Sequence, residues 1–181
     1  MVIALFSQEI NESVSEVIQS FLTSKFSKDS KFFIEKKLLS EIKYNNKLDI
    51  IPFNKSKDFY SEIDLMVSIG GDGTFLRTIE YVRDLAIPVM GINTGNLGFL
   101  ATIKKESLDQ AIDKIYNRKF KIENRSLIKV NSDEIGLPKS FFPYALNEVS
   151  VVRKDTTSMI NIKTSLDGSN LNTYWADGLI V

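Results

Sequence analysis

The sequence predicts an α/β domain with a parallel sheet over residues 1–100, followed by an antiparallel β domain over residues 101–181. In the first hundred residues, short runs of consecutive apolar residues alternate with helical patterns, which is typical of buried parallel strands and crossover helices. In the second part, strand-like segments follow one another with turns between them. The length of 181 residues, with 43% hydrophobic and 25% charged residues, suits one large or two small globular domains.

In the first part we expect parallel strands at residues 2–6, 31–34, 48–53, 63–69 and 86–92. The first expected helix has apolar residues at helical spacing, which are Ile10, Val14, Val17, Ile18, Phe21 and Leu22. A short helix is expected at residues 36–44, and another one begins behind the glycines at 70–73. Strand, helix and strand in this order predict right-handed crossovers in a parallel sheet.

The second part begins with a helix and continues as strands. Ser107 to Gln110 has the form of a capping box, which predicts a helix from residue 108. Strands are expected at residues 119–130, 144–152, 159–166 and 171–175. Asp167-Gly168 separates the last two and predicts a hairpin turn.

The composition excludes several classes of site. The sequence has no cysteine and no histidine, so disulfides, thiolate nucleophiles, Ser-His-Asp triads and histidine-ligated metals are excluded. Basic and acidic residues balance at 23 each, which favours neither nucleic acid nor an anionic membrane surface as a partner. Neither a signal peptide nor an apolar run of roughly 20 residues is visible, so we expect a cytoplasmic protein.

The loop Gly70-Gly71-Asp72-Gly73-Thr74 is the first candidate site, because it joins a buried strand to a helix. Open α/β sheets bind ligands at this edge, and glycines allow a ligand to approach the backbone. The helix that follows offers N–H groups to phosphate oxygens. A carboxylate there suits a hydroxyl or a metal ion beside the phosphate, so Asp72 would orient an attacking hydroxyl and accept its proton late. The alternative is a simple hairpin turn.

A second cluster, residues 91–100, follows the next strand and contains three glycines. Two loops at neighbouring strand ends would line one crevice. Neither the G-x-G-x-x-G spacing nor a G-K-[ST] sequence is present, so Rossmann and P-loop sites are excluded.

In these motifs the sequence resembles the NAD kinases. The resemblance rests on the first loop with Phe75-Leu76-Arg77, on Asn93 to Phe99, on Asn147-Glu148, and on Ala176 to Val181. It implies transfer of a phosphoryl group from ATP or polyphosphate to the adenosine ribose 2′-hydroxyl of NAD, with a divalent metal such as Mg²⁺. It also implies a homo-oligomer. The residues it assigns to catalysis or substrate binding are Asp72, Gly73, Arg77, Asn147, Glu148 and Asp177.

Each assignment has a structural alternative. Adjacent strand residues point to opposite faces, so Asn147 and Glu148 share a ligand only at a strand end or a bulge. Arg77 is otherwise a solvated surface charge, and Asp177 is otherwise part of an Asp-Gly turn. A lipid kinase of the diacylglycerol kinase type resembles the chain at Gly70 to Thr74, and a non-catalytic nucleotide-binding module is the third alternative.

Two departures from the family pattern affect the expected activity. The chain stops at Val181, before the Ser/Thr/Gly-rich segment that the resemblance implies for NAD binding. Trp175 stands where several members carry a basic residue. We therefore expect an incomplete second domain, and weak or absent turnover from residues 1–181 alone.

Overall fold

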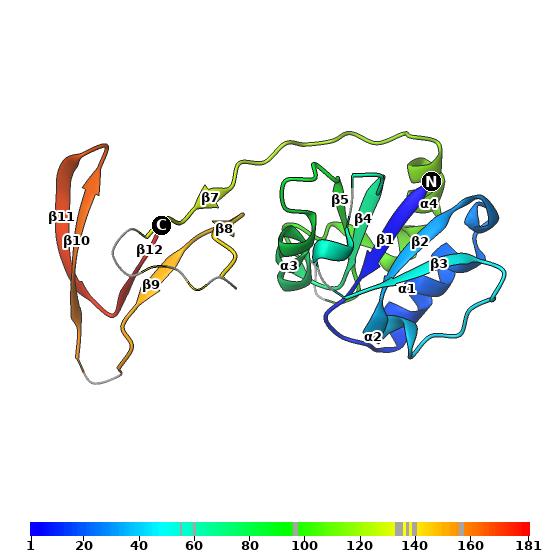
Figure 1. The fold of residues 1–181 in the computed structure, drawn as a ribbon, viewed down its shortest axis with the longest axis horizontal. Coiled ribbons are helices and arrows are strands. Elements are labelled where there is room, and N and C mark those ends of the chain that lie inside the picture. Colours follow the sequence, from blue (N-terminus) through cyan, green and yellow to red (C-terminus); the bar gives the residue numbers. More distant parts are fainter. Residues whose placement is uncertain are drawn as a thin grey trace. The chain divides into compact units, whose positions relative to one another are not determined.

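The chain folds into two compact units, Met1–Glu123 and Asn124–Val181, which are described one at a time (Figure 1). The computed structural model describes residues 1–54, 56–59, 61–95, 98–132, 136, 138, 141–155 and 158–181. The first unit extends past residue 100, because a strand and a helix beyond that point join it. Within the described residues, every helix is too short or too polar to span a bilayer.

Parallel strands form the sheet of the first unit, in the order β3-β2-β1-β4-β5-β6. The strands are β1 (Val2–Phe6), β2 (Lys31–Glu35), β3 (Asp49–Phe53), β4 (Leu65–Ile69), β5 (Val89–Asn93) and β6 (Ile103–Lys104). The α-helices are α1 (Glu12–Thr23), α2 (Lys36–Leu39), α3 (Asp72–Val82) and α4 (Leu108–Tyr116). Short 3-10 helices are η1 (Ser27–Asp29), η2 (Ser56–Asp58) and η3 (Lys105–Ser107). The predicted α/β class with a parallel sheet is confirmed.

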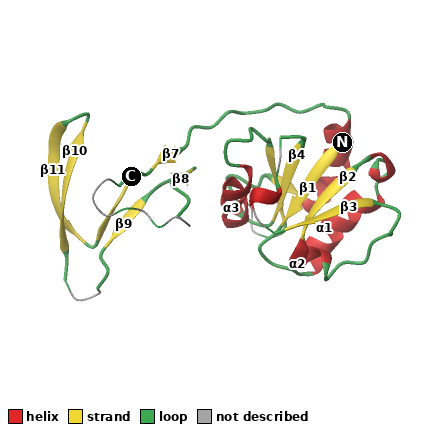
Figure 2. Ribbon diagram, viewed as in Figure 1, coloured by secondary structure: helices red, strands yellow, loops and turns green. Residues whose placement is uncertain are grey.

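Helices cover both faces of this sheet (Figure 2). Helices α1 and α4 pack on one face, and α3 packs on the other. The buried side of α1 is the predicted one from Val14 on, consisting of Val14, Val17, Ile18, Phe21 and Leu22, whereas Ile10 precedes the N-cap residue Asn11 and lies outside the helix. Burying each such side chain stabilises the fold by about 1.5–3 kcal/mol. Asn11 begins the helix, because its side-chain oxygen accepts a hydrogen bond from the Val14 amide at 3.0 Å.

Two predicted elements of the first unit differ from the structure by three residues or more at one end. The helix expected at residues 36–44 ends at Leu39, and the Ser40 hydroxyl donates to the Lys37 carbonyl at 2.8 Å. The strand expected from residue 86 begins at Val89. Ala86 has a left-handed φ of 55°, and Pro88 has no N–H to donate to a ladder. Local backbone geometry therefore overrides the apolar pattern at both places.

The helix predicted from the capping box at Ser107 is present, but the predicted capping hydrogen bond to the Ser107 side chain is not formed. Ser107 has φ −100° and ψ 10°, and its side chain makes no capping hydrogen bond. A capping serine has extended backbone geometry, whereas Ser107 is the last residue of η3. The 3-10 turn leads directly into α4.

The second unit consists of antiparallel strand pairs, β10–β11, β9–β12 and β7–β8. Its strands are β7 (Ile128–Lys129), β8 (Tyr144–Ala145), β9 (Ser150–Val152), β10 (Ile160–Leu166), β11 (Ser169–Ala176) and β12 (Gly178–Ile180). The hairpin predicted at Asp167-Gly168 is confirmed. Both residues are left-handed, with φ of 50° and 80°, as a type I′ turn requires.

Two strands predicted for the second half are interrupted. Within the described part of the chain, the segment expected as a strand over residues 119–130 is a strand at Ile128–Lys129, and the Val130 amide donates to the Pro143 carbonyl at 2.8 Å. An extended segment becomes a strand only where a neighbour supplies ladder hydrogen bonds, which the apolar pattern cannot show. The segment expected at residues 144–152 is divided into β8 and β9, with a bend at Leu146 and Asn147.

Candidate active site

The first glycine-rich loop lies at the carboxyl end of β4, between that strand and α3. Gly70 has φ +147°, a conformation that side chains strongly disfavour. A Cβ atom at this position would lie 2.5 Å from the hydroxyl oxygen of Thr74. The Gly70 amide also donates to the Ile92 carbonyl at 2.9 Å, which joins the loop to β5. Residue 70 must therefore be glycine for the strand to turn into the helix here.

Asp72 is the first residue of α3, after the N-cap residue Gly71. It is partly exposed, and its carboxylate accepts three backbone hydrogen bonds from the second glycine-rich loop. The Phe99 amide donates to Oδ2 at 2.8 Å. The amides of Leu100 and Ala101 donate to Oδ1 at 2.9 and 3.0 Å. The structure thus brings the two predicted loops together around one carboxylate, and the hairpin alternative for Asp72 is wrong.

Gly98 makes this contact possible. A Cβ atom at residue 98 would lie 2.2 Å from Oδ1 of Asp72 and 2.6 Å from Oδ2. Real Cβ atoms do not approach oxygen so closely, so only a glycine lets the loop close onto the carboxylate. The sequence showed a glycine in the cluster, but its contact with a residue 26 positions earlier was not predicted. A glycine directly before the aromatic residue Phe99 was the available signal in the sequence.

Asn93 fixes the base of the second loop. Its side chain is 5% exposed, and its amide nitrogen donates to the Ala101 carbonyl at 3.2 Å. Its amide oxygen accepts from the Gly95 amide at 2.8 Å. One side chain at the end of β5 therefore ties both arms of the loop that holds Asp72.

The electrostatics of Asp72 follow from these contacts. Hydrogen bonds from the amides of Ala101, Phe99 and Leu100 lower the pKa of this carboxyl below its ordinary value of 3.8. A carboxylate has roughly four lone-pair positions, and three amides occupy all but about one of them. Among the hydrogen bonds from described residues, the position that remains is on Oδ2. Asp72 is therefore a charged hydrogen-bond acceptor with room for one further donor.

A pH dependence follows with a definite sign. Because the folded pKa lies below 3.8, the charged form and its stabilising bonds persist from neutral pH down through that value. They are lost only as the pH falls through the lowered folded pKa. We expect the ¹³C resonance of the Asp72 carboxyl to titrate with a midpoint below 3.8. A midpoint above the ordinary value would show that the three amide bonds do not form in solution.

The other predicted residues of the first unit lie on α3. Gly73 follows Asp72 directly and is exposed. Arg77 lies further along the same helix, also exposed. Thr74 is buried, and its hydroxyl donates to the side-chain oxygen of Gln8 at 3.4 Å. Gln8 was not among the predicted site residues.

The remaining predicted residues belong to the second unit. Asn147 and Glu148 are both exposed and lie between β8 and β9, outside any strand. Strand alternation therefore does not force their side chains onto opposite faces. Asp177 lies in the bend between β11 and β12, where its carboxylate pairs with the Arg153 guanidinium at 3.0 Å. This ion pair is a structural role for Asp177 that the sequence did not suggest.

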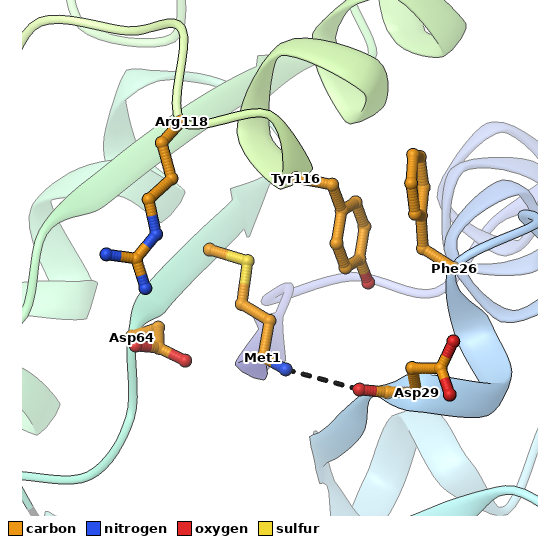
Figure 3. Close-up of a pocket in the computed structure, with 6 residues that line it drawn as sticks. All are labelled: Met1, Phe26, Asp29, Asp64, Tyr116 and Arg118. Atoms are coloured by element: carbon orange, nitrogen blue, oxygen red, sulfur yellow. Dashed lines mark hydrogen bonds between the residues drawn. The ribbon is translucent and has the colours of Figure 1, made fainter.

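A separate hollow of about 310 Å³ lies near the amino ends of strands β1 and β4, whereas the candidate site lies at the carboxyl ends (Figure 3). Arg118 and Asp64 lie on one side of the Met1 side chain, and Tyr116 and Phe26 lie on the other. The two aromatic rings stack at 4.3 Å. The residues that line this hollow belong to neither glycine-rich loop, so the candidate site remains at Asp72.

The comparisons with known proteins agree with this geometry. The family model of the ATP-NAD kinase N-terminal domain matches residues 7–120, which include both loops. The chain belongs to the NAD kinase family. An NAD kinase of Christiangramia forsetii is 39% identical over 183 residues, which cover 100% of this chain and 62% of the relative. An NAD kinase of Bacteroides fragilis is 42% identical over 144 residues, which cover 80% of this chain and 48% of the relative.

Among solved structures, yeast NADH kinase complexed with NADH is similar, with a TM-score of 0.78 and 20% identity. The match covers 99% of this chain and 56% of that protein, and it supports the fold described above. The chain spans at most 62% of the length of these three proteins. The diacylglycerol kinase alternative rests on the first loop alone, whereas the family model matches residues 7–120.

Proposed function

We propose that the intact protein is an NAD kinase, which transfers a phosphoryl group from ATP or polyphosphate to the 2′-hydroxyl of the adenosine ribose of NAD. The product would be NADP. The observation that carries the proposal is the Asp72 carboxylate, held between two glycine-rich loops in a chain of this family. Its remaining acceptor position suits the hydroxyl of a sugar.

In the proposed reaction, the ribose 2′-oxygen attacks the terminal phosphorus of the donor. The bond between that phosphorus and its bridging oxygen breaks, and the shortened donor leaves. Asp72 orients the hydroxyl by accepting its hydrogen bond, then receives the proton late, when the attacking oxygen has become acidic. A carboxylate with a lowered pKa is a weak base, so orientation contributes more than early proton removal.

A divalent metal such as Mg²⁺ is part of the proposal. Within the described residues, no group of three or more acidic side chains is placed to hold a metal ion. Mg²⁺ usually keeps several water ligands and is held in part by substrate phosphates, so an ion that arrives with the donor does not need such a group. Bound there, it would neutralise charge on the phosphates. The acceptor position of Asp72 that the described amides leave free is then kept for the hydroxyl.

Each of the other predicted residues has its own proposed contact with the substrate. Gly73 leaves the first turn of α3 open beside the dinucleotide, and Arg77 on the same helix would meet ligand phosphate. Asn147 and Glu148 would contact the dinucleotide through an exposed bend, and Asp177 would meet its nicotinamide side. Cytoplasmic location and self-association of the intact protein also remain predictions.

The direct test is to incubate the intact protein with NAD and either ATP or polyphosphate, and to identify the product. We expect NADP, detected by an NADP-specific dehydrogenase and confirmed by mass. Diacylglycerol offered with labelled ATP should give no labelled lipid. NAD binding measured by calorimetry without any NADP would instead support the non-catalytic nucleotide-binding module.

The assignment of Glu148 makes a separate prediction. Glu148→Gln in the intact protein should raise the KM for NAD about tenfold or more, because a hydrogen bond to a charged group contributes about 1.5–3 kcal/mol. The KM for the donor should change little. Asp155→Asn is the matched control, because it removes one exposed acidic charge from the same unit. Equal NAD KM values for the two variants would remove Glu148 from the substrate site.

A further inference from the structure

The order of the first sheet marks a crevice beside β1. From β1 the chain continues through β2 to β3 on one side, whereas β4, β5 and β6 lie on the other. The strand order therefore reverses between β1 and β4, which are direct neighbours (Figure 1). Open α/β sheets bind ligands outside the carboxyl ends of the strands at such a reversal. The loops there are residues 7–11 after β1 and residues 70–71 after β4.

Two polar side chains of the loop after β1 are used by the fold. The Ser7 hydroxyl donates to the Glu9 carbonyl at 2.8 Å, and Asn11 caps α1. Gln8 differs, because its side chain is exposed and crosses to the first turn of α3. Its Oε1 accepts the hydrogen bond from Thr74 at 3.4 Å. Among the described residues, the Nε2 group of Gln8 has no hydrogen-bond acceptor, so its two N–H donors remain for a ligand.

Gln8 also lies on a defined side of Asp72. Strand β4 pairs with β1 on one edge and with β5 on the other. The amides that hold Asp72 come from the loop after β5, whereas Gln8 comes from the loop after β1. A Cβ atom at residue 73 would lie 3.9 Å from Oε1 of Gln8, so Gln8 borders the residue next to Asp72. The site is therefore lined on two sides, by Gln8 after β1 and by the loop after β5.

Phosphoryl transfer needs binding groups on two sides, because the attacking and leaving oxygens lie roughly in line on opposite sides of the transferred group. We propose that Gln8 binds the phosphate chain of the donor, on the β1 side of Asp72. The amide donates hydrogen bonds to phosphate oxygens, while Thr74 holds its oxygen and thereby sets the direction of its N–H groups. This proposal rests on the proposed kinase function, and the shared ligand chemistry is the phosphate chain of ATP or polyphosphate.

The test is Gln8→Glu in the intact protein, which keeps the length of the side chain and places a negative charge beside the phosphates. We expect the KM for the donor to rise about tenfold or more, because two donors are lost and a repulsion is added. The KM for NAD should stay close to that of the wild type. Gln110→Glu is the matched control, because it makes the same change at an exposed position of α4.

Comparing ATP with polyphosphate as the phosphoryl donor shows which part of the donor Gln8 contacts, the phosphate chain or the nucleoside. Similar rises in KM for ATP and for polyphosphate support a contact with the chain they share. A rise for ATP alone assigns Gln8 to the nucleoside and overturns the proposal. A rise in the KM for NAD alone assigns it to the acceptor, and values equal to those of Gln110→Glu also contradict it.

A binding measurement keeps this test independent of turnover. Inorganic tripolyphosphate titrated into the intact wild-type protein and into Gln8→Glu should bind the variant about tenfold more weakly or worse. If the wild type makes no NADP, the proposed function fails, and the tripolyphosphate result still decides the role of Gln8. If Gln8→Glu unfolds, Gln8→Met removes the donors without adding a charge, and unchanged tripolyphosphate affinity would then refute the proposal.

Discussion

Asp72→Asn in the intact protein should lower kcat for NADP formation at least about 10²-fold, the loss typical for a catalytic acid or base. The amide has nearly the same shape as the carboxylate, but it cannot accept the proton of the ribose hydroxyl. It also has only one oxygen. If that oxygen takes the amides of Leu100 and Ala101, the new NH₂ group faces the Phe99 amide, and two donors oppose each other.

The measurement is steady-state NADP formation, with thermal unfolding to show that the variant is folded. Asp84→Asn is the matched control, because it removes the same charge from an exposed position after α3. We expect the control to keep its turnover. An Asp72→Asn protein with undiminished turnover would exclude Asp72 from the mechanism and leave the site without its proposed acceptor.

Gly98→Ala is the second variant from which we expect a large effect. Its added methyl group would lie 2.2 Å from Oδ1 of Asp72, so the loop or the carboxylate must move by about an ångström or more. A displacement of about 1 Å at a reacting group costs about 10²-fold in rate, and we expect a loss of kcat of that order. The pKa of the Asp72 carboxyl should rise toward its ordinary value as the amide bonds lengthen.

Gly95→Ala is the control for the same loop. A Cβ atom at residue 95 meets nothing within 4 Å, so the extra methyl group fits without movement. We expect a much smaller loss of activity than for Gly98→Ala, together with an unshifted Asp72 titration. If both variants lose activity equally, the close approach of residue 98 is not what makes the loop functional.

The local elements of the first unit were predictable because each is encoded by its own residues. Strand β1 has the bounds predicted from its apolar run, and α1 buries the predicted side of its helical pattern. The strand predicted at residues 119–130 forms only in part, because a strand also depends on residues elsewhere in the chain. Its ladder needs a partner elsewhere in the chain, and among the described residues the ladder pairs of this segment join Ile128 to Ala145 and Lys129 to Tyr144. Patterns of hydrophobicity show the capacity to form a strand but not the neighbour that completes it.

In the candidate site, too, the chemical group could be predicted from the sequence and its contacts could not. Asp72 was predictable as a chemical group, because glycines surround it between a strand and a helix. Its hydrogen bonds were not, because the amides at residues 99–101 are 27 to 29 positions away and meet Asp72 only once β4 pairs with β5. The contact between Gln8 and Thr74 spans 66 positions and depends on the pairing of β1 with β4. Sheet order, which the sequence does not state, determines both.

The amides of Phe99, Leu100 and Ala101 have an experimental use that follows from their unusual acceptor. Most protected amide protons in a sheet report on a neighbouring strand, whereas these three report on a single side chain. Their nitrogen and proton chemical shifts, and their rates of exchange with deuterium, should therefore change together whenever Asp72 gains a proton, meets a hydroxyl or turns away. A two-dimensional NMR spectrum would follow the state of one carboxylate through three backbone signals.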